Sequence, residues 1–322
     1  MQSFDVTLPS SLEFELEAPL LPDVTEVEMT ERLRGLQARF GRLGNEVDRP
    51  IQRGDAVVVS WLAVRDNTME YVPGSAAVQH GILITEEGNA FQKVLHRTLS
   101  GQTTGSSVQV PMESACYFVY IHSVHTLTVP NTKALAKGLE LEDETALFAL
   151  LHEETRLHHQ QQWQKTLLGE AVGLLVQKSR VEIPESWVDA QLKADWEAGD
   201  GHLLHTLAQF IPLAARLAEQ GFAAWAAAQR DKIRHQLYRQ CVLQRLIEEQ
   251  RIPLPPEALT RQLAYVGDPV GLSAEQVWER FKSEHQEHIV ANQVHLEQAA
   301  RWWLKQGVLR QEGQRIKLAE IL

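Results

Sequence analysis

The histidines in three short stretches are the residues of this sequence best suited to metal chemistry. They are His152, His158 and His159 in LHEETRLHHQQQ, His202 and His205 in GHLLH, and His285 and His288 in EHQEH. Two histidines three residues apart share one face of a helix and could begin a zinc site. However, no HExxH pattern occurs, and no third ligand follows at a fixed spacing. We therefore expect no metal site and interpret these residues as exposed histidines on helices.

The two cysteines and the glycine-containing turn offer no other reactive group. Cys116 and Cys241 lie on segments of different character, so we expect two buried structural thiols and no nucleophile. The turn SGQTTG (100–105) joins a predicted helix end to a strand. That is the wrong order for a phosphate held at a helix N-terminus. No nucleotide or other cofactor is expected.

The composition limits the classes of partner. The 322 residues carry a formal net charge of −11, which disfavours a mainly electrostatic grip on nucleic acid. No window holds 18 uninterrupted apolar residues, and MQSFDVTLPSSLEFELEA at the start lacks a basic region followed by an apolar run. We predict a cytoplasmic protein with more than one core that contacts neither nucleic acid nor membrane.

The sequence divides into three segments with different hydrophobic patterns, and the elements they form must position any functional side chains. In residues 1–48, LEFELEA alternates like a half-buried strand. Thr25 and Glu28 fit a capping box for a helix whose apolar stripe runs from Val27 to Leu43. Residues 51–127 predict strands at 56–64, 106–110 and 116–127 and one short helix at 89–99. From residue 128 to residue 322 the apolar residues recur at helical spacing. The pattern predicts an α+β protein, with a small antiparallel-sheet domain inserted in a mainly helical, two-armed domain.

The helical part contains one short sequence motif twice. VEIPESWVDAQL (181–192) returns as IPLPPEALTRQL (252–263), with Pro184 matching Pro255. Proline is well suited to the first turn of a helix, because its missing N–H would be unpaired there. We therefore expect long helices to end near Lys178 and Gln250, each followed by an extended corner and a new helix.

The order of these parts resembles trigger factor, a family of bacterial folding chaperones, over roughly residues 12–310. The stretches that carry the resemblance are RPIQRGDAVVVSW (49–61), LHRTLSGQTTGSSVQVP (95–111), RVEIPESWVDAQL (180–192) and IRHQLYRQCVLQRLIEEQRIPL (233–254). The resemblance implies an FKBP-like isomerase domain at 51–127 and a helical, substrate-holding domain at 128–322, on which the 1–48 lead-in packs. Nothing matches the family's ribosome-docking Gly-Phe-Arg-x-Gly-Lys loop, so ribosome docking is not expected.

The resemblance also implies a cleft that binds a twisted prolyl bond, whose rotation has a barrier of about 18–20 kcal/mol. The residues that fall at cleft positions are Trp61, Tyr71, Gln92, Leu95 and Tyr117. The family's Ile-Pro-Gly-Phe stretch becomes QKVL (92–95), so the backbone donor would lie near Gln92 and Leu95 replaces an aromatic wall. The loop after VQV shrinks to PMESA. We expect weak or absent isomerase activity and assign no catalytic residue.

Aromatic residues of the helical part form a second candidate site for client chains. They are Phe210, Phe222, Trp225, Trp302 and Trp303. One interpretation makes them the core between packed helices. The other leaves part of them exposed, and an exposed apolar patch of more than a few hundred Å² marks a binding surface.

Three functional hypotheses follow. The preferred one is an ATP-independent chaperone that holds apolar segments of unfolded or partly folded client proteins. The second is a working peptidyl-prolyl isomerase, with the helices serving as a docking platform. The third is a dedicated partner of one client protein in assembly or secretion.

Overall fold

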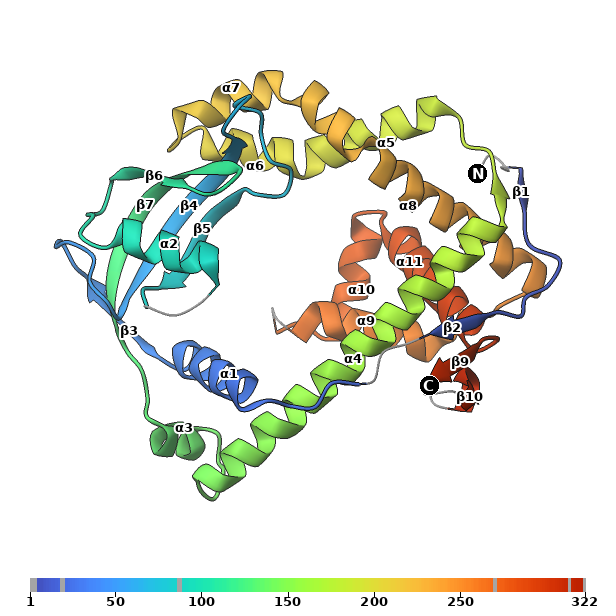
Figure 1. The fold of residues 1–322 in the computed structure, drawn as a ribbon, viewed down its shortest axis with the longest axis horizontal. Coiled ribbons are helices and arrows are strands. Elements are labelled where there is room, and N and C mark those ends of the chain that lie inside the picture. The colour runs from blue at the N-terminus through green and yellow to red at the C-terminus, as the bar shows by residue number, and fades with distance from the viewer. Residues whose placement is uncertain (1–4, 18–20, 86–88, 269–270, 312–313, 321–322) are drawn as a thin grey trace. The chain divides into compact units, whose positions relative to one another are not determined.

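The computed structural model describes residues 5–17, 21–85, 89–268, 271–311 and 314–320. The chain forms two compact units, each assembled from separate stretches of sequence (Figure 1). Unit 1 consists of Met1–Asp23, Leu157–Pro184 and Arg234–Leu322, and unit 2 of Val24–Arg156 and Glu185–Ile233. The chain combines helices with mainly antiparallel strands, so the α+β prediction is confirmed.

The sheet of unit 2, together with one helix, forms what we call the sheet lobe. Its strands are β3 (Arg42–Glu46), β4 (Asp55–Arg65), β5 (Ala77–Leu83), β6 (Ser107–Pro111) and β7 (Ala115–Thr128). They pair in the order β3-β7-β4-β5, and β6 pairs with β7. Helix α2 (Ala90–Leu99) buries Leu95 and Leu99 in a core with Val57, Val59 and Ile121. The strands predicted at 56–64, 106–110 and 116–127 and the helix at 89–99 are confirmed, and β5 is an addition.

The turn between β6 and β7 is as short as the sequence indicates. β6 ends at Pro111 and β7 begins at Ala115, and the Met112 amide donates to the Ala115 carbonyl at 2.8 Å. No long loop therefore follows β6 in this lobe.

The first long helix is shorter than its apolar stripe predicts. The capping box of Thr25 and Glu28 is present and starts α1 (Glu26–Arg39), but Leu43 lies in β3 opposite Leu127. Glycine at position 44 suits this strand pairing, because a Cβ there would overlap the Thr126 side chain of β7. Leu33 and Leu36 of the predicted stripe do pack on a small core, together with Met29, whereas Val27 is 69% exposed and Phe40 is 44% exposed.

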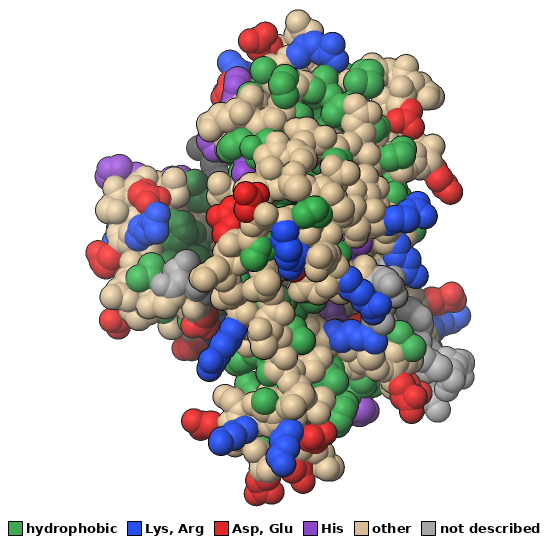
Figure 2. Space-filling view, turned by 90° about the vertical axis from the view of Figure 1, so that its left-hand side faces the viewer, with side chains coloured by type: hydrophobic (Ala, Val, Ile, Leu, Met, Phe, Trp, Pro, Cys, Tyr) green, Lys and Arg blue, Asp and Glu red, His purple; other side chains and the backbone are tan. Residues whose placement is uncertain are grey.

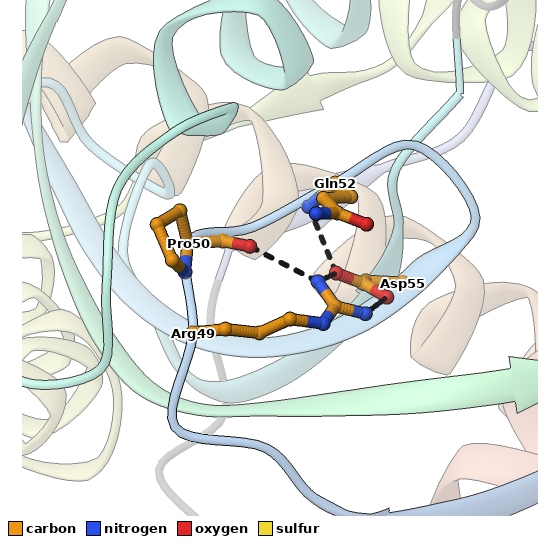
Figure 3. Close-up of polar contacts among 4 residues, drawn as sticks. All are labelled: Arg49, Pro50, Gln52 and Asp55. Carbon is orange, nitrogen blue, oxygen red and sulfur yellow. Dashed lines mark hydrogen bonds and ion pairs between the residues drawn. The ribbon is translucent and has the colours of Figure 1, made fainter.

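An ion pair between the half-buried Arg49 and the buried Asp55 fixes the start of β4. Arg49 donates from Nη1 and Nη2 to the two carboxylate oxygens of Asp55 at 2.7 and 2.8 Å, and the Gln52 amide donates to the same carboxylate at 2.8 Å (Figure 3). Burial alone raises the pKa of Asp55. The hydrogen bonds from Arg49 and Gln52 and the Arg49 charge outweigh burial, so this pKa lies below its usual value.

Helices make up the rest of unit 2. They are α1, α3 (Thr132–Gly138), the first part of α4 (Glu144–Lys178), α5 (Glu185–Ala198), α6 (Asp200–Leu207), α7 (Pro212–Gln220) and the first part of α8 (Phe222–Gln250). Leu135 of α3 packs with Leu147 and Leu151 of α4. We call α5, α6, α7 and the start of α8 up to Ile233 the helical module.

Unit 1 combines helices with three pairs of strands. Its further elements are β1 (Val6–Thr7), β2 (Glu15–Glu17), β8 (Arg180–Val181), α9 (Pro256–Gly267), α10 (Ala274–Ser283), α11 (Glu287–Leu304), β9 (Val308–Gln311), β10 (Gln314–Lys317) and the 3₁₀ helix η2 (Leu318–Glu320). β1 pairs with β8, β2 pairs in parallel with β9, and β9 pairs with β10. Residues 128–322 are mainly helical, as predicted, but the helical pattern does not reveal the strands β8, β9 and β10 within them.

Both copies of the repeated corner are built as predicted. α4 ends at Lys178 and α5 begins directly after Pro184, whereas α8 ends at Gln250 and α9 has Pro255 as its N-cap. The copies differ in backbone detail. The first contributes β8 to a strand pair, and in the second Arg251 has a left-handed φ of 49°.

Candidate functional site

Four side chains of the sheet lobe form an aromatic group that we call the Trp61 cluster. Phe91 lies between Trp61 and Tyr117, with ring centroids 6.3 and 4.5 Å away, and His80 meets Trp61 edge to face at 5.1 Å. Trp61 and Tyr117 come from neighbouring strands, and Phe91 comes from the first turn of α2. All three are half-buried against the lobe's core. The group therefore offers partly exposed rings to an apolar ligand.

The other two expected cleft residues on α2 have different surroundings. Leu95 is buried beneath the cluster in the core. Gln92 is exposed, but its backbone amide donates to Asn89 Oδ1 at 2.9 Å as part of the α2 capping box. A substrate carbonyl at this amide would have to displace the cap, which stabilises a helix by about 1 kcal/mol.

Tyr71 is separate from the Trp61 cluster. It is 4% exposed, and its hydroxyl donates to Asp200 Oδ1 at 2.7 Å while accepting from the Ala76 amide at 3.3 Å. Burial raises the pKa of Tyr71, and the hydrogen bond to the Asp200 carboxylate and its charge raise it further, so the phenol stays protonated. The structure thus assigns Tyr71 to a joint between the sheet lobe and α6.

Phe210, which follows α6, packs on the sheet lobe. Its ring lies 5.2 Å from Tyr120 and meets His122 edge to face at 4.5 Å, measured between centroids. Ser60 Oγ lies 2.7 Å from His122 Nε2 and accepts from the Gln79 amide at 2.8 Å. Burial lowers the pKa of His122, so the neutral ring is favoured. This serine–histidine pair is no nucleophile for a bulky substrate, because Ser60 is fully buried.

Phe222 and Trp225 pack around Trp196 of α5. The centroid of Trp196 lies 6.0 Å from Phe222 and 5.4 Å from Trp225. Phe222 is half-buried, whereas Trp225 is 5% exposed and donates from Nε1 to Asp200 Oδ2 at 2.7 Å. In this structure only Phe222 of the pair offers part of its ring to solvent.

The neighbouring tryptophans of α11 differ in exposure. Trp303 is fully buried in the unit 1 core, stacks on Phe14 at 4.5 Å and donates from Nε1 to the Ala171 carbonyl at 2.8 Å. Trp302 is half-buried and packs on the edge of the same core. The core interpretation therefore fits Trp303, and the surface interpretation applies at most to Trp302.

Known proteins with a similar sequence are trigger factors. No family model matches the chain. Among curated proteins, the trigger factor of Mycobacterium tuberculosis (strain ATCC 25177 / H37Ra) is 26% identical over 285 residues, covering 82% of this chain and 58% of the relative. That of Mycobacterium sp. (strain KMS) is 24% identical over 295 residues, covering 88% and 60%. The chain is similar to trigger factor. It spans just over half the length of these relatives.

One solved structure that matches this chain is also a trigger factor. It is described as "Promiscuous Substrate Recognition in Folding and Assembly Activities of the Trigger Factor Chaperone" and is 17% identical in sequence. The match covers 92% of this chain and 73% of that one, with a TM-score of 0.35.

Among the residues that the structure describes, no group of three or more His, Cys, Asp or Glu side chains is placed to hold a metal ion. Burial raises the pKa of both Cys116 and Cys241, and the Asp66 charge adds to this at Cys116. Raised pKa values make both thiols poor nucleophiles. No helix among the described residues has the length and apolar content to cross a bilayer.

Three residues of these sites escape prediction from the sequence. Phe91 precedes the stretch that carries the family resemblance, but its spacing of four residues from Leu95 does place both on one helix face. His80 lies on β5, which the pattern does not reveal. Asp200 lies between two glycines with no motif around it, so its partners become evident only in three dimensions.

Proposed function

We propose that the chain is an ATP-independent chaperone that reversibly binds apolar segments of unfolded or partly folded proteins. The observation that carries this proposal is the similarity to trigger factors along 82% of the chain. The proposal includes a cytoplasmic location and no contact with nucleic acid or membrane. It keeps the domain boundaries 1–48, 51–127 and 128–322, with the sheet lobe in the FKBP-like role and β3 of the lead-in added to its sheet.

Large apolar side chains at the surface support this proposal. In unit 2 they are Val27, Phe40, Leu43, Met69, Val129, Phe148, Leu150 and Trp187, and in unit 1 Leu21, Leu157, Tyr265, Val266 and Ile289. Figure 2 shows hydrophobic side chains reaching one face in many places, with acidic and basic side chains between them. Many weak contacts of this kind suit clients without a common sequence. Among the aromatic residues expected to hold clients, the partly exposed Phe210, Phe222 and Trp302 fit this role, and the buried Trp225 and Trp303 fit a supporting one.

Equimolar protein without nucleotide is expected to slow the aggregation of chemically unfolded citrate synthase, measured by light scattering. Replacing Phe148→Ser together with Leu150→Ser on α4 should weaken the effect about threefold, because both side chains are exposed and apolar. The matched control is His152→Ser with Glu154→Ser, two exposed polar residues of the same helix. Equal suppression by both double variants would exclude a role for Phe148 and Leu150, and no suppression by the unchanged protein would exclude the chaperone function.

The Trp61 cluster supports a second, smaller activity in the same protein. Its partly exposed rings support binding of a proline side chain, whereas the occupied Gln92 amide and the aliphatic Leu95 argue against efficient isomerisation. We propose that this cluster binds proline-containing segments and accelerates their isomerisation weakly or not at all.

A short proline–phenylalanine peptide is expected to bind the sheet lobe at the Trp61 cluster. Phe91→Leu should weaken binding about tenfold, because it removes the ring that touches both Trp61 and Tyr117. Phe118→Leu is the control, since Phe118 alternates with Tyr117 and points to the other face of β7. Titration followed by tryptophan fluorescence measures affinity, and a protease-coupled assay measures isomerisation. Equal affinities of the two variants would place the peptide elsewhere, and rapid isomerisation would contradict the weak activity proposed here.

A further inference from the structure

The Asp200 carboxylate connects the sheet lobe to the helical module. Its Oδ1 accepts from the Tyr71 hydroxyl at 2.7 Å, and its Oδ2 accepts from Trp225 Nε1 at 2.7 Å and from the Gly74 amide at 3.0 Å. Tyr71 and Gly74 belong to the segment between β4 and β5, whereas Trp225 belongs to α8. Hydrogen bonds to an ionised group are roughly twice as strong as neutral ones. One side chain thus holds three donors from two parts of unit 2.

The local sequence explains why a carboxylate can stand at this position. The start of α6 lies directly against Trp196, and a Cβ on Gly201 would lie 2.6 Å from Trp196 Nε1. Only glycine fits there, so α6 can begin close to the tryptophan pair of Trp196 and Trp225. Asp200 is therefore placed by close packing rather than by a flexible loop.

A second contact completes this joint on the face of the sheet. Phe210 packs on Tyr120 and His122, which alternate along β7 with the core residues Val119 and Ile121. Alternation places Tyr120 and His122 on the face opposite α2. The helical module and α2 therefore cover opposite faces of the same sheet.

The joint conceals two aromatic rings that the sequence associates with client binding. Tyr71 is 4% exposed and Trp225 is 5% exposed, and both point their polar atoms at Asp200. We propose that Asp200 is an autoinhibitory latch: while it accepts from Tyr71, Gly74 and Trp225, the sheet lobe stays closed on the helical module and both rings are withheld from clients. When the latch opens, the Tyr71 ring and the Nε1 edge of Trp225 become part of the client-binding surface, while Trp225 keeps its contacts with Trp196 and Phe222. The withholding of clients rests on the chaperone function proposed above, whereas the latch itself rests on the contacts alone.

The chemistry of the joint makes opening feasible. Asp200 is only half-buried, so water reaches its carboxylate and can replace a lost hydrogen bond. An apolar client segment would in turn cover the rings that opening exposes, and a ligand that binds only the open state shifts the population toward it. A client and Asp200 therefore compete for the same two side chains.

Asp200→Ala is expected to open the joint. Spin labels on cysteines replacing the exposed Lys93 of α2 and Glu219 of α7, with Cys116→Ser and Cys241→Ser, report the distance across it. Unchanged Asp200 should give one narrow distance distribution, and Asp200→Ala a broader and longer one. Binding of reduced, carboxymethylated α-lactalbumin should tighten about fivefold, because less of the population must open first. Trp225→Phe, which removes only the N–H donor, should change both readouts in the same direction by less.

Controls separate the latch from the proposed function. Glu197→Gln removes a nearby exposed charge and should leave both readouts unchanged. An unchanged distance distribution in Asp200→Ala and Trp225→Phe would overturn the latch. A broader distribution with unchanged client affinity would overturn the withholding of clients. A broader distribution with no client binding by any form would uphold the latch and refute the chaperone function. If Asp200→Ala fails to fold by circular dichroism, Trp225→Phe decides the same questions.

Discussion

Trp303→Ala is expected to lower the free energy of unfolding of unit 1 by about 3–5 kcal/mol, the range for removing a large aromatic side chain from a packed core. The indole is fully buried among residues of α4, α8 and α11, and it stacks on Phe14 from the N-terminal stretch. The substitution also removes the donor to the Ala171 carbonyl. Urea denaturation followed by circular dichroism measures the loss.

The neighbouring Trp302→Ala provides the matched control. Trp302 has the same chemistry on the same helix but is half-buried, so its removal should cost about 1–2 kcal/mol. If Trp302 holds clients, this variant should fold normally and suppress aggregation less. Similar losses of stability in the two variants would contradict the packing described for α11, and a stable Trp303→Ala protein would reopen a surface role for that residue.

Local signals in the sequence predicted several of the element boundaries. The Thr25–Glu28 capping box and the Pro184 and Pro255 corners act within a few residues, so their effects are readable without the rest of the fold. The C-terminal hairpin of β9 and β10 depends instead on β2, almost 300 residues away. A strand whose partner lies so far along the chain leaves little local signature.

The aromatic residues of the candidate sites show the same limit. Helical spacing identifies the face that carries Trp302 and Trp303, but only packing decides that one is core and the other half-exposed. Likewise Tyr71 fits an aromatic cleft by its position in the sequence, yet a carboxylate 129 residues later removes it from that role. Long-range polar contacts therefore decide which of the predicted binding residues remain available.

Arg49→Met is expected to lower the thermal unfolding midpoint of the sheet lobe by about 5 °C or more, because it leaves the buried Asp55 carboxylate with only the Gln52 amide. The pH dependence has a definite sign. The pKa of Asp55 in the folded protein lies below its usual 3.8, so the pair stabilises the fold above that pH and loses this effect as the pH falls through the lowered pKa. In Arg49→Met burial dominates and raises this pKa, so acidification from pH 5 should cost the variant less stability than it costs the unchanged protein.

Arg65→Met is the control for this pair, since the nitrogen and oxygen of Arg65 and Glu70 are 4.0 Å apart and both side chains are exposed. An exposed pair is screened by water and contributes little, so its loss should scarcely change the midpoint. Asp55→Asn tests the titration itself. The amide keeps the shape of the side chain but cannot ionise, so this variant should lose the acid dependence that Asp55 contributes, whereas Arg49→Met should reverse its sign. If Arg49→Met and Arg65→Met melt alike, or if Asp55→Asn keeps the full loss of stability between pH 5 and pH 3, then the Arg49–Asp55 pair is not what holds the start of β4. In that case the Gln52 turn and the strand pairing of β4 with β7 would have to fix it alone.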